Sequence, residues 1–243
     1  PSDARLVDGS PRFEGLYDPG ENPLLSEYLG VLDGLLDGFS PVGAGYFRFD
    51  AALDPSRLPA DPAASLRDDA TVQLVDVDED SPERGRRIPL LVSFRPRAGE
   101  YYRPNTLRWY PAPGFPLRPT NRYSTVVTDG VRAADGGSVA ASAALREVLG
   151  LDPAAGAAAS LRDAVAADVA YLEELGIARE RIVHFTSFTT GDPTAELMRV
   201  ADHVPVGTPA PDFDPQAWEV FERSNYVEYR GRYGPSPNYQ AGQ

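Results

Sequence analysis

The sequence predicts a β-sandwich with an N-terminal helix and an inserted helical segment, so the expected fold class is mainly β within an α+β whole. Apolar and polar residues alternate over residues 107–110 and 123–127, which is typical of strands with one buried face. The 24 prolines and 22 glycines supply turns between many short elements. The spacing Leu117-x-Pro119-x-x-x-Tyr123 predicts a tyrosine corner, in which the tyrosine hydroxyl bonds to the backbone a few residues upstream and fixes the crossover between two sheets.

The chain divides into four predicted parts. Residues 1–37 are expected to form an extended arm and a helix, and residues 38–140 the β-sandwich. Residues 141–204 are a helical insertion with a strand that returns to the sandwich. Residues 205–243 are a spacer, a strand and a C-terminal linker rich in Pro, Ser, Asn, Gln and Gly.

The first helix and the first strands follow from residue spacing. Residues 24–36 place apolar side chains at helical intervals, which predicts an amphipathic helix whose stripe packs on the sandwich. Phe47 and Phe49 predict an opening strand with both rings turned inward. Residues 71–77 and 88–94 predict two strands that pair as a hairpin.

The insertion contains two predicted helices before its strand. Residues 140–149 predict a short helix, and Ser160 with Asp163 three residues later predicts the start of a longer one through a capping box. Leu175-Gly176-Ile177 predicts a Schellman stop for that helix. Residues 181–189 are short and rich in β-branched and aromatic side chains, which predicts the returning strand.

Three further elements are predicted toward the end of the chain. Asp192-Pro193 is typical of a helix start and predicts a third helix. Asp214-Pro215 predicts a short helix carrying Trp218 and Phe221. The alternation over residues 226–233 predicts a last strand.

Three segments carry a resemblance to a known family. The pattern Leu-x-Pro-x-x-x-Tyr-x-x-Val-Val-x-x-Gly-Val-x-x-x-x-Gly, which starts at Leu117, resembles the end of the bacterial Ig-like domain first named from S-layer proteins. Residues 38–43 (Gly-Phe-Ser-Pro-Val-Gly) and 47–50 (Phe-Arg-Phe-Asp) resemble its opening. Phe188-Thr189-Thr190 is similar to a motif of the N-terminal, non-catalytic region of large secreted bacterial lipase-like α/β-hydrolases. The resemblance spans residues 36–204 and implies an Ig-like β-sandwich.

The same resemblance implies a function. The chain is expected to be a non-catalytic Ig-like N-terminal module of a secreted lipase/esterase-like α/β-hydrolase, packing on the catalytic domain or shaping access to its site. It implies a secreted or cell-surface location, with the periplasm also open. Two alternatives remain: a free-standing extracellular carbohydrate-binding or adhesion module, and one chain of a processed enzyme that contributes a wall to a site completed elsewhere.

Catalytic residues are not expected in this chain by itself. The Gly-x-Ser-x-Gly turn of serine hydrolases does not occur in the sequence. The nearest segment, residues 38–42, lacks the second glycine, and Pro41 has no N–H to offer an oxyanion. His184 and His203 are interpreted as structural or surface residues, because a histidine without a partnered nucleophile and carboxylate is not a triad.

Composition excludes several other classes. Lys+Arg is 23 and Asp+Glu is 36, for a net charge of −13, which argues against nucleic acid or an anionic membrane as partner. All the basic residues are Arg, so no lysine Schiff base can form. The cysteine count of 0 excludes disulfides and thiolate metal sites. No apolar run approaches the ~18 residues of a membrane helix, so no transmembrane segment is predicted.

One loop offers a weak metal candidate. Asp76, Asp78 and Asp80 alternate between two predicted strands and carry hard oxygen ligands that suit a structural Ca²⁺. The segment lacks the glycine and the distal glutamate of an EF-hand. The competing interpretation, which we favour, is a solvated acidic turn partly neutralised by nearby arginines, namely Arg84, Arg86 and Arg87. No other cofactor is expected.

Aromatic residues form two groups along the sequence. The groups are Tyr101, Tyr102, Trp109 and Tyr110, and then Tyr226, Tyr229 and Tyr233. Three interpretations are open: ordinary packing within the sandwich, which we favour, an interface with a partner hydrolase domain, and a stacking platform for a ligand such as a sugar.

Overall fold

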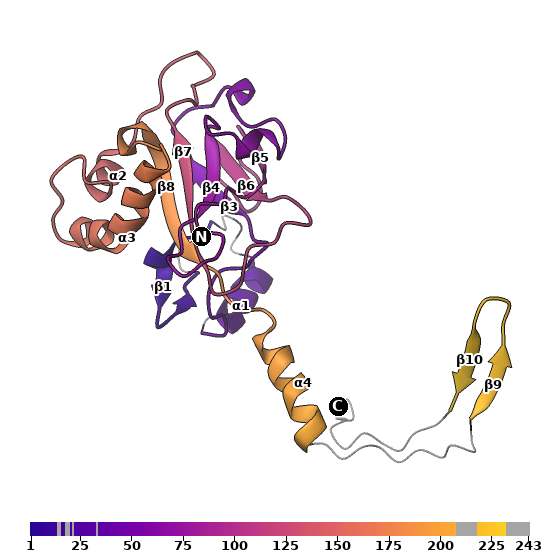
Figure 1. Ribbon diagram of the computed structural model, residues 1–243. Coiled ribbons are helices and arrows are strands. Elements are labelled where there is room, and N and C mark those ends of the chain that lie inside the picture. Colours follow the sequence, from indigo (N-terminus) through magenta and orange to yellow (C-terminus); the bar gives the residue numbers. More distant parts are fainter. Residues whose placement is uncertain (14–15, 18–19, 21, 33, 208–217, 232–243) are drawn as a thin grey trace. The chain divides into compact units, whose positions relative to one another are not determined.

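The computed structural model describes residues 1–243 apart from 14–15, 18–19, 21, 33, 208–217 and 232–243 (Figure 1). The chain divides into two compact units, Pro1–Asp192 and Pro193–Gln243. The break lies within the 141–204 part, which was predicted to be one insertion. About 27% of the structure is helical and 26% is strand. The expectation of a mainly β chain is therefore corrected to a mixed fold with several antiparallel sheets.

The first unit is built on two three-stranded antiparallel sheets. One has the order β3-β6-β5, with β3 at Gly45–Arg48, β6 at Thr106–Pro111 and β5 at Leu90–Arg95. The other has the order β4-β7-β8, with β4 at Val72–Asp76, β7 at Arg122–Thr128 and β8 at Ile182–Thr189. Short 3-10 turns, η2 (Pro55–Arg57) and η3 (Ala64–Leu66), lie between β3 and β4.

Both sheets contribute to one hydrophobic core. Phe47, Leu90 and Trp109 from the first sheet are buried together with Leu74 and Phe188 from the second. The predicted inward residues of the opening strand, Phe47 among them, are therefore in the core. Two antiparallel sheets that share one core make a β-sandwich, as the alternation in the sequence predicts.

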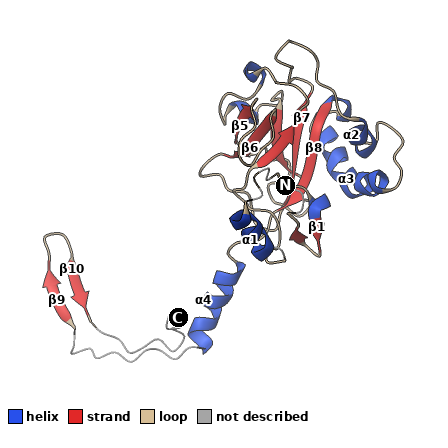
Figure 2. Ribbon diagram, turned by 180° about the vertical axis from the view of Figure 1, so that it is seen from behind, coloured by secondary structure: helices blue, strands red, loops and turns tan. Residues whose placement is uncertain are grey.

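Two inserted helices cover the outer face of the second sheet. They are α2 (Ala143–Val148) and α3 (Ala157–Glu174), followed by the 3-10 turn η4 (Arg179–Arg181). Figure 1 and Figure 2 show both helices beside β8. A second core forms there, where Val75 and Val126 of the sheet pack against Val169 and Leu172 of α3. The predicted returning strand is confirmed, because β8 pairs with β7 along its length.

Two local predictions are confirmed in atomic detail. The Tyr123 hydroxyl accepts a hydrogen bond from the Arg118 backbone N–H at 2.9 Å, which is the tyrosine corner. At the end of α3, Gly176 has a φ of 86°, and the Ile177 N–H reaches the Leu172 carbonyl at 2.9 Å. That pattern is a Schellman stop, and it needs glycine at the left-handed position.

The predicted hairpin of residues 71–77 and 88–94 is wrong. β4 pairs with β7, and β5 pairs with β6, so the two segments lie in different sheets. Among the described residues, the two segments meet only at their ends, at an isolated bridge between Val75 and Arg87. There the Ile88 N–H donates to the Leu74 carbonyl at 2.9 Å and the Asp76 N–H to the Arg86 carbonyl at 3.0 Å. Alternation shows that each strand has an apolar face, but it does not show whether the two faces lie side by side or meet across a core.

Three helix predictions are also corrected. α3 begins at Ala157 after Gly156, so Ser160 lies inside the helix and does not cap it. Phe221 lies in a strand, so the helix predicted to carry it is wrong there, while residues 214–217 lie outside the described residues. The helix α1 (Pro23–Leu32) has no fully buried residue, and the stripe that was expected to pack on the sandwich is only half-buried, at Leu25, Leu29 and Leu32.

The N-terminal segment, residues 1–11, contains η1 (Asp3–Arg5) and a small hairpin of β1 (Leu6–Val7) and β2 (Ser10–Pro11). The second unit contains α4 (Ala195–Gly207) and an antiparallel hairpin of β9 (Glu219–Glu222) and β10 (Val227–Arg230). None of the described helices is long and apolar enough to cross a membrane.

Candidate functional site

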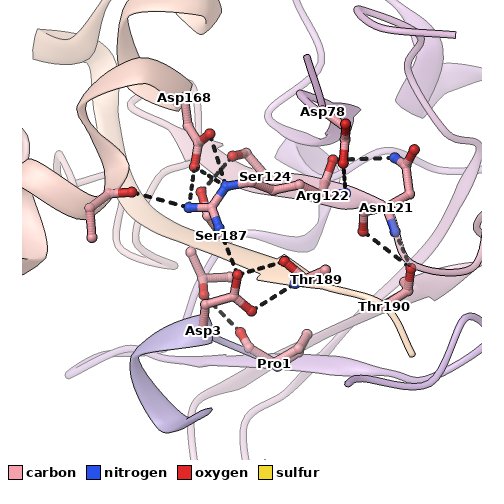
Figure 3. Close-up of polar contacts among 12 residues, drawn as sticks. Pro1, Asp3, Asp78, Asn121, Arg122, Ser124, Asp168, Ser187, Thr189 and Thr190 are labelled. Carbon is pink, nitrogen blue, oxygen red and sulfur yellow. Dashed lines mark hydrogen bonds and ion pairs between the residues drawn. The ribbon is translucent and has the colours of Figure 1, made fainter. Parts of the chain in front are cut away.

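A cluster of charges connects four separate parts of the first unit (Figure 3). Arg122, the first residue of β7, reaches Asp168 of α3 with Nε at 2.9 Å and Nη2 at 2.8 Å from Oδ2. Its Nη1 lies 2.7 Å from Asp3 of the N-terminal segment. Its backbone N–H donates at 2.9 Å to Asp78, in the acidic loop of residues 76–85. One residue thus holds the sheet, an inserted helix and the N-terminal segment together.

The electrostatics of the cluster follow from its burial. Burial lowers the pKa of Arg122, but the hydrogen bond and charge of Asp168, together with the charges of Asp3 and Asp78, raise it above its ordinary value. The guanidinium therefore stays charged. Its side chain is 26% exposed, against 7% for Asp168, so this is a partly buried ion pair with well-formed hydrogen bonds.

Sequence reasoning missed this cluster, although one signal was present. Asp168 lies on the apolar face of α3, one turn from Val165 and next to Val169, and it is buried. A charged residue within the buried stripe of a helix needs a partner of opposite charge. That partner is Arg122, which lies inside the segment that carries the tyrosine corner.

Each residue of the Phe188-Thr189-Thr190 motif has a structural role. Phe188 is in the core of the sandwich. The Thr189 N–H and hydroxyl donate to the Asp3 carboxylate at 2.7 and 2.8 Å. The Thr190 hydroxyl accepts from the Asn121 N–H at 3.0 Å and so holds the loop that precedes β7. The motif therefore orders the N-terminal segment and the tyrosine corner.

A cavity of about 290 Å³ lies next to Arg122. Its walls are α2, α3, β8 and the first residues of the N-terminal segment. Most of the lining is apolar, with Leu145, Leu161, Val165 and Phe185 among it.

The acidic loop uses its carboxylates to hold its own backbone. Asp76 is buried, and its oxygens accept from the Asp78 N–H at 3.1 Å and the Ser81 hydroxyl at 2.6 Å. Asp78 accepts from the Asp80 N–H at 2.9 Å as well as from Arg122. Within the described part of the chain, no three His, Cys, Asp or Glu side chains gather as a metal site would require.

Two of the three nearby arginines pair with glutamates of the same loop. Arg84 lies over the Tyr171 ring at 4.0 Å and 3.9 Å from Glu79, while Arg86 pairs with Glu83. Arg87 pairs with Asp68 at 2.9 Å. The expected partial neutralisation of the acidic turn is therefore confirmed for Arg84 and Arg86, through Glu79 and Glu83, and corrected for Arg87.

The two histidines lie in different units. His184 of β8 stacks on Phe47 at 5.1 Å and meets Phe49 edge-on at 4.5 Å. Burial lowers its pKa, although the hydrogen bond to the Arg48 backbone and the charge of Asp50 act the other way. A hollow of about 380 Å³ opens beside this ring. His203 is exposed on α4.

Ser40, in the segment nearest to a Gly-x-Ser-x-Gly pattern, stabilises its own turn. Ser40 is exposed, and its hydroxyl accepts from the Val42 N–H at 3.3 Å within a turn. This is ordinary turn chemistry, in which the hydroxyl stabilises its own backbone.

The residues of the first aromatic group lie partly in the core and partly at the surface. Trp109 is 1% exposed and packs on Phe188 at 5.9 Å, so it cannot form a surface platform. Tyr101 is 48% exposed and donates to Glu100 at 2.9 Å. Tyr102 and Tyr110 are partly buried. Trp109 is thus corrected from a platform candidate to a core residue.

The second aromatic group belongs to the β9–β10 hairpin. Val220 pairs with Tyr229 and Glu222 with Val227, so these four side chains share one face of the ribbon. Trp218 contacts the Tyr229 ring edge-on at 6.5 Å. Tyr226 is 63% exposed in the turn between the strands, and Tyr233 lies outside the described residues.

The two faces of this hairpin differ in chemistry. The apolar face, defined as Trp218, Val220, Val227 and Tyr229, is between 43% and 61% exposed, and Glu222 is the charged residue beside it. On the opposite face, Arg230 lies over the Phe221 ring at 4.7 Å, and Arg223 pairs with Glu228 at 3.0 Å. The arginines of the charged face contact residues of the same hairpin, whereas the apolar face is exposed to solvent.

Comparison with known proteins gives no relative: no protein-family model matches this sequence, and no curated protein matches it significantly.

Proposed function

We propose that this chain is a non-catalytic Ig-like module that binds the catalytic domain of a secreted bacterial lipase/esterase-like α/β-hydrolase. Three observations support the proposal. The two-sheet sandwich has a tyrosine corner, as Ig-like domains do. The polar cluster around Arg122 holds segments of the first unit together. The Phe188-Thr189-Thr190 motif, which is similar to a motif of such enzymes, takes part in these contacts through Thr189 and Thr190.

The apolar face of the β9–β10 hairpin is the observation that carries the proposal. An isolated two-stranded hairpin is marginal in water, and an exposed apolar face adjoining a charge-paired one is typical of a contact surface. Aromatic residues such as Trp218 and Tyr229 supply large contact areas at low entropic cost. A partner domain that covers this face would stabilise the hairpin as well as bind it.

The adhesion alternative is less well supported. Of its two candidate aromatic platforms, the first loses Trp109 to the core, which leaves Tyr101 as its exposed ring. The proposal includes export of the chain to the cell surface, the periplasm or the medium. This location follows from the enzyme class that the sequence resembles.

The test begins with the coding region that contains this chain. The proposal expects a neighbouring domain with Gly-x-Ser-x-Gly followed by a carboxylate and a histidine. That domain, expressed separately, should bind the chain in isothermal titration calorimetry. The double variant Trp218→Ser/Tyr229→Ser should weaken binding at least tenfold, whereas Glu219→Gln on the opposite face should leave it unchanged.

Two results would overturn the proposal. One is esterase activity of the isolated chain on a p-nitrophenyl ester, since the module has no catalytic role. The other is a coding region without a hydrolase domain, which would make a free-standing binding protein the better account.

A further inference from the structure

The cavity beside Arg122 has the features of a small-molecule site. Ligand pockets are concave and mostly apolar, with a few polar groups that fix orientation, and they start at about 300 Å³. This cavity holds about 290 Å³ between the inserted helices and β8. Its apolar walls come from both helices and from Phe185 of the strand. The proposed function uses none of these residues.

The polar end of the cavity is a guanidinium held from two sides. Asp168 occupies Nε and Nη2 of Arg122, and it is fixed by its position in α3. Asp3 occupies Nη1 from the opposite side (Figure 3). Arginine presents a planar fork of donors that matches a carboxylate, so the chemistry of this end selects carboxylate groups.

Asp3 differs from Asp168 in how it is held. It belongs to the N-terminal segment, whose residues Ser2, Asp3 and Ala4 form one wall of the cavity. The segment is tied to β8 by the bonds of Thr189 to Asp3 and by the Thr186 hydroxyl, which donates to the Pro1 carbonyl at 2.7 Å. These ties are short-range polar contacts that can be exchanged for contacts with water.

We propose that this cavity binds a carboxylic acid with an apolar chain of about eight carbons, and that the N-terminal segment is its lid. The ligand carboxylate replaces Asp3 at Arg122 Nη1, and its chain fills the apolar space between α2, α3 and β8. The exchange of one carboxylate for another leaves the guanidinium paired, so no buried charge is exposed. Asp3 moves into water with the segment.

The size of the ligand follows from the volume. A water-sized group takes about 30 Å³, so a cavity of about 290 Å³ accommodates roughly ten non-hydrogen atoms. Octanoate has that number and carries one carboxylate at the end of an unbranched chain.

The test is isothermal titration of the full chain with octanoate, octanol and octylamine. Octanoate should bind at least tenfold more tightly than either of the others. Asp3→Asn removes the competing carboxylate while its amide oxygen can still accept from Thr189, and it should tighten octanoate binding at least tenfold. Asp8→Asn is the matched control, because Asp8 lies in the same segment outside the cavity lining, and its φ of 52° suits asparagine.

A second pair of variants tests the location. Val165→Phe fills the cavity and should abolish octanoate binding. Leu161→Phe should do the same with less risk to folding, because Leu161 is 38% exposed. Circular dichroism confirms that each variant is folded.

Three results would overturn the proposal. Equal affinities for octanoate and octanol, with no effect of Asp3→Asn, would show that the guanidinium does not select the carboxylate. Tighter binding of octylamine would show that the net negative cluster selects cations. Absence of octanoate binding even to Asp3→Asn would show that there is no site.

Discussion

Single residues in this molecule connect segments that are far apart in the chain. Arg122 contacts Asp3, Asp78 and Asp168, which belong to the N-terminal segment, the acidic loop and an inserted helix. Such a residue has more effect on stability than a surface arginine, because its partners are partly buried and its hydrogen bonds are charge-assisted.

Asp168→Asn should destabilise the first unit by about 2 kcal/mol, the range of a hydrogen bond to a charged group. The substitution keeps the shape of the side chain but leaves the Arg122 guanidinium without its fixed counter-charge. Urea denaturation followed by circular dichroism measures the change. Asp163→Asn is the control, since the Asp163 side chain is 71% exposed and should change stability by less than about 0.5 kcal/mol.

Tyr123 should make stability fall at high pH. Burial raises the pKa of Tyr123 to about 12, with the bond from Arg118 acting the other way. Between about pH 10 and pH 12 the unfolded chain loses this proton while the native chain retains it, so the free energy of unfolding falls as pH rises, by about 2 kcal/mol. Denaturation midpoints across this range measure the effect, and Tyr123→Phe should lack this component. An identical pH dependence in the variant would contradict the assignment.

The His184 imidazole should remain neutral to a lower pH than a free histidine. Burial against Phe47 and Phe49 lowers its pKa from 6.5. The unfolded chain therefore takes up this proton first, and acidification below about pH 6.5 favours unfolding. NMR titration of the ring protons in His203→Gln, which leaves one histidine, measures the value. A midpoint at or above 6.5 would show that the ring is not desolvated.

At the scale of elements, the start of the sandwich meets its end through a close backbone contact. Phe39 forms a parallel bridge with Thr190, and a Cβ on Gly38 would lie 2.4 Å from the Gly191 nitrogen. No side chain fits at that distance without a backbone shift. The segment that resembles the opening of the domain is therefore fixed to the motif at the end of β8.

Gly38→Ala should destabilise the first unit by roughly 1–3 kcal/mol, the cost of forcing extra atoms into a packed site. Thermal unfolding measures the loss. Gly30→Ala is the matched control: it lies in α1 with no atom within 4 Å of its new Cβ, and alanine favours a helix. A melting temperature for Gly38→Ala equal to that of the wild type would mean that this contact does not persist in solution.

Local signals predicted the elements better than their pairing. The tyrosine corner and the Schellman stop depend on a few adjacent residues, and both are present. The pairing of β4 with β7 instead of β5 depends on contacts between distant segments, which alternation does not encode. The start of α3 was misplaced because Ser160 and Asp163 imitate a capping box four residues after Gly156.

The charged cluster was beyond prediction for a related reason. Asp3, Arg122 and Asp168 are separated by long stretches of sequence, and no spacing rule connects them. The buried position of Asp168 in α3 indicated that a partner was needed but did not identify Arg122. The apolar stripe of α1 is only partly covered, because periodicity shows that a face is apolar and not how fully it packs.

At the scale of the whole molecule, the two hydrophobic cores both belong to the first unit. The core of the sandwich and the core beneath α2 and α3 are formed by residues between Phe47 and Phe188. The large apolar side chains of the second unit are mostly exposed, on α4 as well as on the hairpin. Stability should therefore reside in Pro1–Asp192, and the second unit should be free to use its apolar surface for a partner.

A protein truncated after Asp192 should consequently fold as the full chain does. Its melting temperature in calorimetry should lie within about 2 °C of the full-length value, since a change of 1 kcal/mol shifts a domain of this size by about 2–4 °C. Its near-ultraviolet circular dichroism should retain the signal of Trp109 in the core. A fall of more than about 5 °C would show that residues 193–243 contribute to the core, and their apolar surface would then be needed for folding instead of binding.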